Sequence, residues 1–461
     1  MTFSALDSRL LGPLFATDPM RAAFADEARL AHMIAVEAAL ARAQGRLGLV
    51  PLALAEAIAA VTPADLDLDA LGAATAVAGV PVIPFVKAMQ GRLPTALEPH
   101  FHKGATTQDV MDTALVLAMR DGFDLIAAEL AAILSALARL AREHRATPCV
   151  GRTYGQHAAP ITFGFKAAVW LSGIADAAAA LPALRERVLV ASLGGPVGTL
   201  AGLKEHGPAV LEAFAAELGL NAPPLAWHAN RSRIAAAGAW LAALIGALAK
   251  MAGDVAHLAS TEVGEVAEPH VPGRGGSSAM PHKRNPVGAT VIFAAHGAAA
   301  SLVVPLLQGQ AAQHERPAGA WHGEWHALPP LFGVASGALR EARSLAEGLQ
   351  VDPERMRENL DLTRGLLFAD AVAARLAPRL GREAAHHLVE AAAGRVRAGE
   401  GSLREVLARD AAVEPGDSVE APFDLTPAIA AASPWIDRVI AAAEDARAAL
   451  LTPETSPHAP A

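Results

Sequence analysis

The strongest constraint on the fold is a long stretch without any charged side chain. Residues Val287 to Gln313 contain no Asp, Glu, Lys or Arg. The stretch is long enough to span a bilayer, but it carries His296, Pro305 and several glycines and glutamines. A helix that is apolar on all sides is equally expected at the centre of a helical bundle. We therefore expect a buried helix enclosed by its neighbours and no membrane span.

Long helices are expected elsewhere in the chain as well. Isoleucine and leucine recur at steps of three and four from Ile126 to Leu140, which predicts one continuous helix. The predicted long helices are Asp121–Glu143, Phe163–Leu184 and Ile234–Ala259. Aromatic residues make up only 4% of the chain, so alanine, leucine and valine supply the apolar mass and favour close packing. The expected fold class is all-α, because no alternation of strands with helices is found.

Three domains are expected from the length and from a change in composition. A chain of 461 residues exceeds the size at which one hydrophobic core stops growing. We place an N-terminal helical domain at residues 1–110, a central helical bundle at 111–350 and a C-terminal helical domain at 351–461. A final helix is predicted from Pro434 to Leu451, after which Pro453 to Ala461 is expected to fray.

Charge and cysteine content exclude several kinds of partner. The formal net charge of -9 implies no basic face for nucleic acid. Cys149 is the only cysteine, which excludes an intrachain disulfide and favours a reducing compartment. The residues after Met1 show no basic segment followed by an apolar run, so no secretory signal is expected. The histidines do not have metal-ligand spacing on one helix. These features predict a cytoplasmic protein without a bound metal.

Chemistry is concentrated in residues 273–286, which read Gly-Arg-Gly-Gly-Ser-Ser-Ala-Met-Pro-His-Lys-Arg-Asn-Pro. The glycines let the backbone approach a ligand closely, and the prolines fix turns on the far side. Ser277 and Ser278 offer hydroxyl groups. Lys283 offers a positive charge and Asn285 an amide donor, and together these groups suit an anion whose charge grows during a reaction. Turn chemistry alone is equally consistent with a surface linker.

Two further polar clusters interrupt the apolar helices. The first, His102 to Thr113, has the features of a helix N-terminus, which also binds carboxylates well. The second, Gly151 to Gly164, lies between two predicted helices. It contains Arg152, Thr153, Tyr154, Gln156 and His157. A simple connecting loop does not need so many polar groups, so we interpret both clusters as candidate binding sites.

Together the three segments resemble the fumarase/aspartase superfamily. Residues 273–286 match its signature, Gly-Ser-Ser-x-Met-Pro-x-Lys-x-Asn-Pro, at every fixed position. The other two clusters are similar to its His-x-Gly-x-Thr-Ser-x-Asp and Gly-Arg-Thr-His-x-Gln-x-Ala-x-Pro regions, and Gly194 to Thr199 resembles its glycine-rich substrate turn. The resemblance implies three mostly helical domains and a central long-helix bundle shared by a homotetramer. It also implies active sites built from different chains, and no cofactor.

The resemblance further implies roles for single residues. Enzymes of the superfamily add or eliminate across the bond next to a carboxylate, through a dianion that needs positive and hydrogen-bonding partners. Ser277 is then the residue that transfers the proton, and Lys283 and Asn285 stabilise the charge. The implied substrate-binding residues are His102, Thr106, Thr107, Arg152, Thr153, Tyr154, Gln156, His157, Thr199, Ser278 and Met280.

Two departures from the superfamily pattern narrow the expected reaction. Tyr154 stands where fumarases and adenylosuccinate lyases have a His, and Thr290 stands where they have the Glu that orients it. An enzyme without this pair is expected to use a leaving group that needs little protonation, such as a carboxylate, whose conjugate acid has a pKa of about 4. This indicates lactone chemistry. Within the superfamily the chain most resembles the lactone-forming cycloisomerases, and this resemblance implies a small tricarboxylate substrate, 3-carboxy-cis,cis-muconate, in protocatechuate breakdown.

Alternatives stay open at this point. Tyr154 replaces a Trp that is common in these cycloisomerases, and it either donates a hydrogen bond to a carboxylate or fills the space of the Trp. Ser232 stands where an Asp is expected, so a related lactone is an alternative substrate. An adenylosuccinate- or argininosuccinate-type lyase is the alternative reaction within the superfamily. A catalytically silent homologue, like the lens crystallins, is the alternative of a different class.

Overall fold

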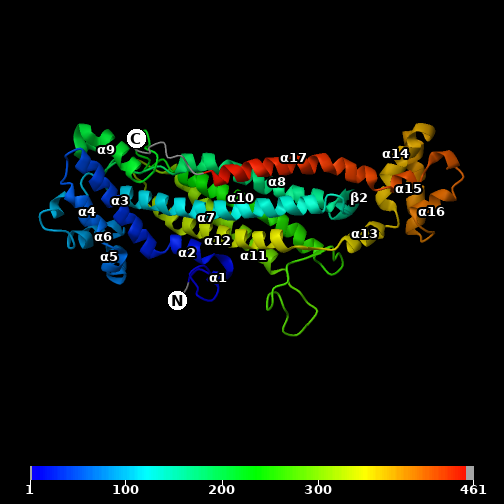
Figure 1. The fold of residues 1–461 in the computed structure, drawn as a ribbon, viewed down its shortest axis with the longest axis horizontal. Coiled ribbons are helices and arrows are strands. Elements are labelled where there is room, and N and C mark those ends of the chain that lie inside the picture. The colour runs from blue at the N-terminus through cyan, green and yellow to red at the C-terminus, as the bar shows by residue number, and fades with distance from the viewer. Residues whose placement is uncertain (1–2, 453–461) are drawn as a thin grey trace.

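The computed structural model describes residues 3–452, and a bundle of long helices runs through the middle of the molecule (Figure 1). The bundle helices are α7 (Thr107–Glu143), α8 (Phe163–Val188), α10 (Ser232–Leu258), α11 (Val287–Gln308), α12 (Ala320–Gly348) and α17 (Thr426–Leu451). Their shared core is built mainly from alanine, leucine, isoleucine and valine side chains, as the composition predicted. The all-α prediction is confirmed. The segment Pro453 to Ala461, expected to fray, lies outside the described residues.

Helix α7 has 37 residues and joins two predicted parts, the helix N-terminus within His102 to Thr113 and the long helix expected from Asp121. The helix predicted to start at Asp121 is its C-terminal part. Its first turn starts after Thr106, whose backbone N–H donates to the side chain of Asp109 at 2.9 Å. The buried polar residues Gln108, Asp109 and Asp112 interrupt the apolar stripe in this part of the helix. Because they interrupt the apolar periodicity, the sequence does not show that the two predicted parts form one helix.

Shorter helices lie at the end of the bundle where α7 starts, and the first two of them lie further along, against α12 (Figure 1). They are α1 (Gly12–Phe15), α2 (Asp18–Ala23), α3 (Asp26–Arg46), α4 (Ala53–Ala59), α5 (Leu68–Ala78), α6 (Val82–Gln90) and α9 (Gly207–Glu217). Arg42 of α3 donates to Glu217 of α9 at 2.6 Å, which ties these two helices together. Leu40, Leu54 and Phe85 belong to the same hydrophobic core as the bundle. The N-terminal helices therefore pack on the bundle without a separate core.

The opposite end of the molecule carries a small helical unit (Figure 1). Its helices are α13 (Pro353–Asp361), α14 (Ala369–Leu380), α15 (Arg382–Arg397) and α16 (Leu403–Ala408), and α14 to α16 enclose a core of their own. Helix α17 returns along the bundle, where Ile436 and Ile440 join the main core. It starts at Thr426, before the predicted Pro434, because Pro427 occupies its first turn and Pro434 lies inside the helix.

A β-hairpin follows α7 where a connection between helices was expected. Strands β1 (Pro148–Thr153) and β2 (Gln156–Thr162) pair antiparallel, and a second short pair joins β3 (Val266–Ala267) to β4 (Gln350–Val351). Tyr154 and Gly155 have φ values of 53° and 76°, as in the two-residue turns that suit hairpins. On β1, Cys149 is fully buried, and this burial raises the pKa of its thiol to about 12.

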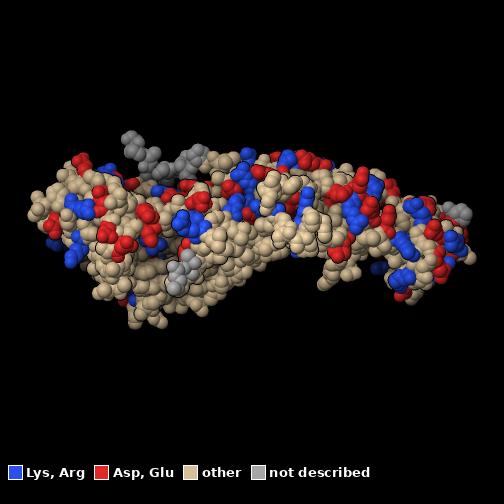
Figure 2. Space-filling model, turned by 90° about the horizontal axis from the view of Figure 1, so that it is seen from below, with Lys and Arg blue, Asp and Glu red and all other residues tan. Residues whose placement is uncertain are grey.

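Helix α11 is less enclosed than the sequence predicted. Helices α8, α10 and α11 are long and apolar enough to cross a membrane by length and composition. The chain buries 44% and 50% of the most apolar windows of α8 and α10, but only 28% in the segment that contains α11. Phe293, Val304 and Leu307 of α11 are exposed. Seen from below, the molecule shows a broad area without charged side chains (Figure 2).

Candidate active site

Residues 273–286, here called the signature loop, are pinched at their base. The carbonyl oxygen of Gly275 accepts hydrogen bonds from the backbone N–H of Asn285 at 2.8 Å and from its side-chain amide at 3.1 Å. Gly275 has a φ of 69°, and a Cβ at this position would lie 2.6 Å from the carbonyl oxygen of Asn285. Only glycine fits this close approach. The segment is therefore an ordered loop whose two ends are hydrogen-bonded to each other, and it is not a flexible linker.

The hydroxyl of Ser277 lies in an environment that suits a proton-transfer group. Its Oγ accepts hydrogen bonds from the backbone N–H groups of Met280 at 3.1 Å and Ala279 at 3.4 Å. Two N–H groups directed at one oxygen stabilise negative charge on it. Ser278 and Lys283 are exposed on the same loop, so their side chains are available to another molecule.

Two carboxylates anchor the ends of the signature loop. Glu268 accepts hydrogen bonds from the backbone N–H groups of Gly288 and Ala289, both at 2.9 Å, in the first turn of α11. A carboxylate at this position is favoured by hydrogen bonding and by the helix dipole. At the other end, Arg274 forms an ion pair with the buried Glu341 of α12. The loop is therefore fixed to two bundle helices at its roots.

The first polar cluster packs beside the start of α7. His102 has a φ of 58°, and its Nδ1 lies 2.6 Å from a carboxylate oxygen of Glu37 on α3. Burial lowers the pKa of His102, but the hydrogen bond to Glu37 and the charges of Glu37 and Asp109 outweigh burial and raise it overall. Thr106 and Thr107 are half-buried at the helix N-terminus, where free N–H groups favour an anion.

Asp109 has the structural role that the helix-start interpretation implies. Besides the N–H of Thr106, it accepts the backbone N–H groups of Gly194 at 2.8 Å and Gly195 at 2.9 Å, and Nε2 of His228 lies 2.6 Å away. These contacts hold the glycine-rich turn against α7. The exposed Thr199 lies in this turn, so it shares this end of the helix with the first cluster.

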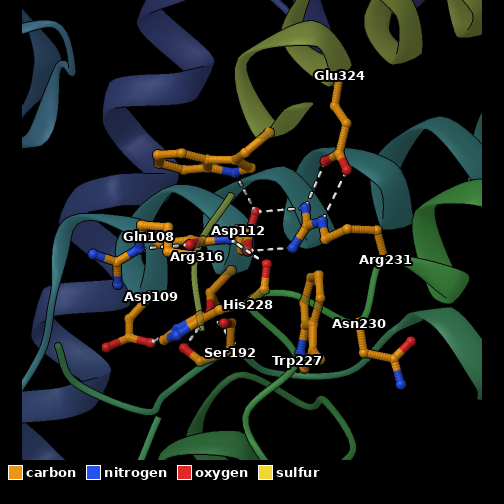
Figure 3. A network of polar contacts seen from close by, with 12 residues as sticks. Gln108, Asp109, Asp112, Ser192, Trp227, His228, Asn230, Arg231, Arg316 and Glu324 are labelled. Carbon is orange, nitrogen blue, oxygen red and sulfur yellow. Dashed lines mark hydrogen bonds and ion pairs between the residues drawn. The ribbon is translucent and has the colours of Figure 1, made fainter. Parts of the chain in front are cut away.

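A buried polar network lies behind this cluster (Figure 3). Arg231 donates to Asp112 at 2.7 and 3.0 Å and to Glu324 at 2.5 and 2.8 Å. Burial raises the pKa of Glu324 even though Arg231 opposes this effect. Gln108 donates to Asp112 at 3.1 Å and accepts from Arg316 at 2.9 Å, which places the Arg316 side chain at the edge of the network. The network joins α7, α12 and the loop that precedes α10.

The second polar cluster lies on the hairpin at the other end of α7. The side chain of Tyr154 is fully exposed at the turn, and Thr153 and Gln156 are exposed beside it. His157 is half-buried, and its pKa is lowered by burial and by the charge of Arg152, so the ring is neutral at pH 7. The exposed side chains of Thr153, Tyr154 and Gln156 are therefore available to a neighbouring molecule.

Arg152 points inward and contacts another residue of the same chain. It donates to Glu265 at 2.5 and 3.1 Å, and Glu265 also accepts from Asn359 at 2.9 Å. The contact links the hairpin to the segment before the signature loop and to α13. We interpret Arg152 as support for the hairpin, and its direct contact with substrate stays a prediction.

One chain does not bring the three clusters together. At a rise of 1.5 Å per residue, the 37 residues of α7 separate the first cluster from the hairpin by about 55 Å. The signature loop projects from the bundle between these two ends (Figure 1). A small substrate cannot touch all three clusters of one chain. A site that uses all of them needs residues from more than one copy.

Sequence reasoning missed the carboxylates that hold the predicted residues in place. Glu37, Glu265 and Glu341 are each buried, and each contacts a cation or an imidazole. A lone carboxylate in an apolar stretch, as in Val36-Glu37-Ala38, indicates a buried and paired charge. The sequence does not show which residue is its partner. Among the described residues, no group of three or more His, Cys, Asp or Glu side chains is placed to hold a metal ion.

Comparisons with known proteins agree on the kind of enzyme. A lyase family model matches residues 14–299, and a model of the adenylosuccinate lyase C-terminus matches residues 365–439. The chain is 44% identical over 442 residues to the 3-carboxy-cis,cis-muconate cycloisomerase of Pseudomonas aeruginosa, covering 94% of this chain and 96% of that protein. It is 46% identical over 417 residues to the nitrosuccinate lyase of Streptomyces davaonensis, covering 88% of each.

A solved structure shows the same fold. The crystal structure of the 3-carboxy-cis,cis-muconate lactonizing enzyme from Pseudomonas putida is similar with a TM-score of 0.90 and 42% identity, over 95% of this chain and all of that one. A long-helix bundle that carries a serine on a glycine-rich loop is the arrangement that the resemblance implies for a fumarase/aspartase-type enzyme. The chain belongs to the lyase family of this superfamily. Several of its relatives, at 40–45% identity over most of the chain, are named cycloisomerases, so the predicted resemblance is confirmed.

Proposed function

We propose that this protein is a cofactor-free cycloisomerase that converts 3-carboxy-cis,cis-muconate to 4-carboxymuconolactone in the cytoplasm. The proposal rests on the residues at positions 154 and 290, which are Tyr and Thr instead of the His and Glu of fumarases. Thr290 donates its hydroxyl to the carbonyl oxygen of Pro286 at 2.8 Å, and Tyr154 extends from the hairpin tip. Neither residue can be part of a His–carboxylate pair that protonates the leaving group. A weakly basic leaving group such as a carboxylate therefore fits best. The activity named for the Pseudomonas relatives supports this choice.

In the proposed mechanism, Ser277 moves the proton. One carboxylate oxygen of the substrate adds to a double bond conjugated to another carboxylate, while Ser277 delivers a proton to the carbon α to that second carboxylate. In reverse, Ser277 removes this proton, and the N–H groups of Ala279 and Met280 stabilise the alkoxide. Lys283 and Asn285 stabilise the dianionic intermediate. The signature loop excludes water when it covers the substrate.

The active form in this proposal is a homotetramer with shared sites. The span of about 55 Å along α7 separates groups that must meet on one small tricarboxylate. The exposed apolar face of α11 is the surface that neighbouring copies would cover. Light scattering should give a particle of four 47.3 kDa chains. A fully active monomer would contradict shared sites.

Turnover of 3-carboxy-cis,cis-muconate by the purified protein tests the proposed reaction. We expect loss of the diene absorbance, and Ser277→Ala should reduce the rate by about 10²- to 10⁴-fold, as for removal of a general acid or base. Ser433→Ala is the matched control, because Ser433 bonds the carbonyl of Ile429 within α17, far along the chain from the signature loop. Adenylosuccinate, incubated in parallel, should not react. No turnover of carboxymuconate would refute the proposal.

A second candidate follows from the same leaving-group argument. Nitrite, like a carboxylate, is a weak base and leaves without prior protonation. The relative from Streptomyces davaonensis is named a nitrosuccinate lyase, so elimination of nitrite from nitrosuccinate is the second reaction that the site supports. Nitrite release measured with nitrosuccinate distinguishes the two candidates. Release of nitrite without turnover of carboxymuconate would make elimination the function.

A further inference from the structure

We propose that Glu37 is a positioning residue of the active site, which orients His102 and keeps its ring charged, so that His102 Nε2 donates a hydrogen bond to a substrate carboxylate. The inference rests on the proposed function only in taking the substrate to be a small polycarboxylate. Glu37 lies on α3, outside the three polar segments that the sequence singles out. It therefore adds a residue from a fourth segment to the site.

The contact between the two side chains is short and buried. Glu37 is 1% exposed, and its Oε1 lies 2.6 Å from His102 Nδ1. Among the described residues, the ring of His102 is the recorded hydrogen-bond partner of this carboxylate. A carboxylate removed from water in this way is stable when a hydrogen-bonded positive charge lies beside it. The pair therefore favours the protonated ring.

Helix α3 and the segment after it fix the backbone that carries the ring. Gln44 donates to the carbonyl oxygen of Lys103 at 2.7 Å, and the ammonium group of Lys103 donates to the carbonyl oxygen of Leu49 at 2.9 Å. His102 itself has a φ of 58°, a conformation that non-glycine residues keep only where the surroundings enforce it, often at functional sites. With Nδ1 directed at Glu37, Nε2 lies on the opposite side of a ring that is 20% exposed.

Two carboxylates near His102 favour the protonated ring, as does the geometry of the contact with Glu37. Glu37 from α3 and Asp109 from α7 both favour the charged ring, and their combined effect outweighs burial, so the pKa of His102 is raised. Lys103, the neighbouring cation, is exposed and bound to a carbonyl. The N-terminus of α7, beginning at Thr107, carries partial positive charge, which does not help to protonate the ring but attracts an anion to this end of the helix. A carboxylate at this point would meet an imidazolium and a helix N-terminus together.

A second His–carboxylate pair in the chain gives a matched comparison. His32 Nε2 lies 3.1 Å from Asp121. Burial outweighs the attraction of Asp121 there, and Arg120 adds to its effect, so the pKa of His32 is lowered. A carboxylate neighbour alone therefore does not keep a histidine charged. The short, almost fully buried contact to Glu37 distinguishes His102 from His32.

Binding of propane-1,2,3-tricarboxylate to the full-length protein, measured by calorimetry between pH 6 and 9, tests the inference. Affinity should be strongest below the raised pKa of His102 and should weaken as the pH rises through it. At pH 6.5, where the raised pKa keeps most of the wild-type ring charged, Glu37→Gln should weaken binding by about 10- to 100-fold, the range for a hydrogen bond to a charged group, and it should move the weakening to lower pH. The variant should also take up more protons on binding, because its ring must first be charged.

Asp121→Asn is the control, and it should leave the affinity and its pH profile unchanged. His102→Gln should bind weakly at every pH and lose the pH dependence, which provides a test if Glu37→Gln does not assemble. An unchanged pH profile in Glu37→Gln, or strong pH-dependent binding by His102→Gln, would overturn the inference. Because the probe is bound and not turned over, these outcomes are independent of whether carboxymuconate proves to be the substrate.

Discussion

Replacement of Arg231 by Met should destabilise the protein strongly, because it leaves two buried carboxylates without their cation. The guanidinium is 0% exposed, and its four hydrogen bonds to Asp112 and Glu324 measure 2.5–3.0 Å. Removal of one partner of a buried ion pair costs about 3–5 kcal/mol. We expect the free energy of unfolding to fall by this amount, measured by denaturant unfolding at fixed protein concentration.

The pH dependence of this loss gives a second test. Burial already raises the pKa of Glu324, and loss of Arg231 raises it further. The folded variant then holds a proton that the unfolded chain releases, so the deficit in stability should be largest near pH 8 and smaller near pH 5. Arg343→Met, which removes a half-exposed ion pair, should cost less than about 1 kcal/mol. A loss below about 1 kcal/mol for Arg231→Met, or an equal loss at both pH values, would refute the reasoning.

Three further substitutions test the supports of the loop and hairpin. Glu268→Ala removes the acceptor of two N–H groups at the start of α11. It should lower the free energy of unfolding, measured by thermal unfolding, by about 1–2 kcal/mol and should slow turnover. An unchanged rate would contradict the anchoring role of Glu268. Gly275→Ala should lower kcat far more than Gly276→Ala. A Cβ at position 275 would lie 2.6 Å from a backbone oxygen, whereas a Cβ at position 276 would have no atom within 4 Å. Equal kcat values for the two variants would contradict this reasoning. Arg152→Ala leaves Glu265 buried without its cation, so calorimetry should show a loss of about 3–5 kcal/mol, and a wild-type melting curve would contradict the pairing.

The superfamily and the helical fold could be predicted because their signals are local. The segment 273–286 is contiguous in sequence, so its motif survives without knowledge of the fold. The periodicity from Ile126 to Leu140 reflects one face of one helix. The roles proposed for Ser277 and the other site residues stay predictions, although the two N–H groups at its Oγ support the role of Ser277.

Pairings between distant segments could not be predicted. Arg152 and Glu265 are far apart in sequence, so nothing local indicates that one neutralises the other. The hairpin from Pro148 to Thr162 was missed because polar residues occupy both of its faces near the turn and a proline lies in its second strand. The partly exposed face of α11 was also unexpected, since an uncharged helix gives no indication of whether its own chain or another copy covers it.

The buried thiol of Cys149 has a practical consequence for studying the signature loop. With a pKa of about 12 and no exposure to solvent, this side chain forms almost no thiolate at neutral pH and resists alkylating reagents. Because the chain has no other cysteine, it behaves as a thiol-free background for chemical labelling. A cysteine introduced at the exposed Ala279 would be the single reactive thiol in each chain. A fluorophore attached there would report loop movement during turnover without any prior removal of native cysteines.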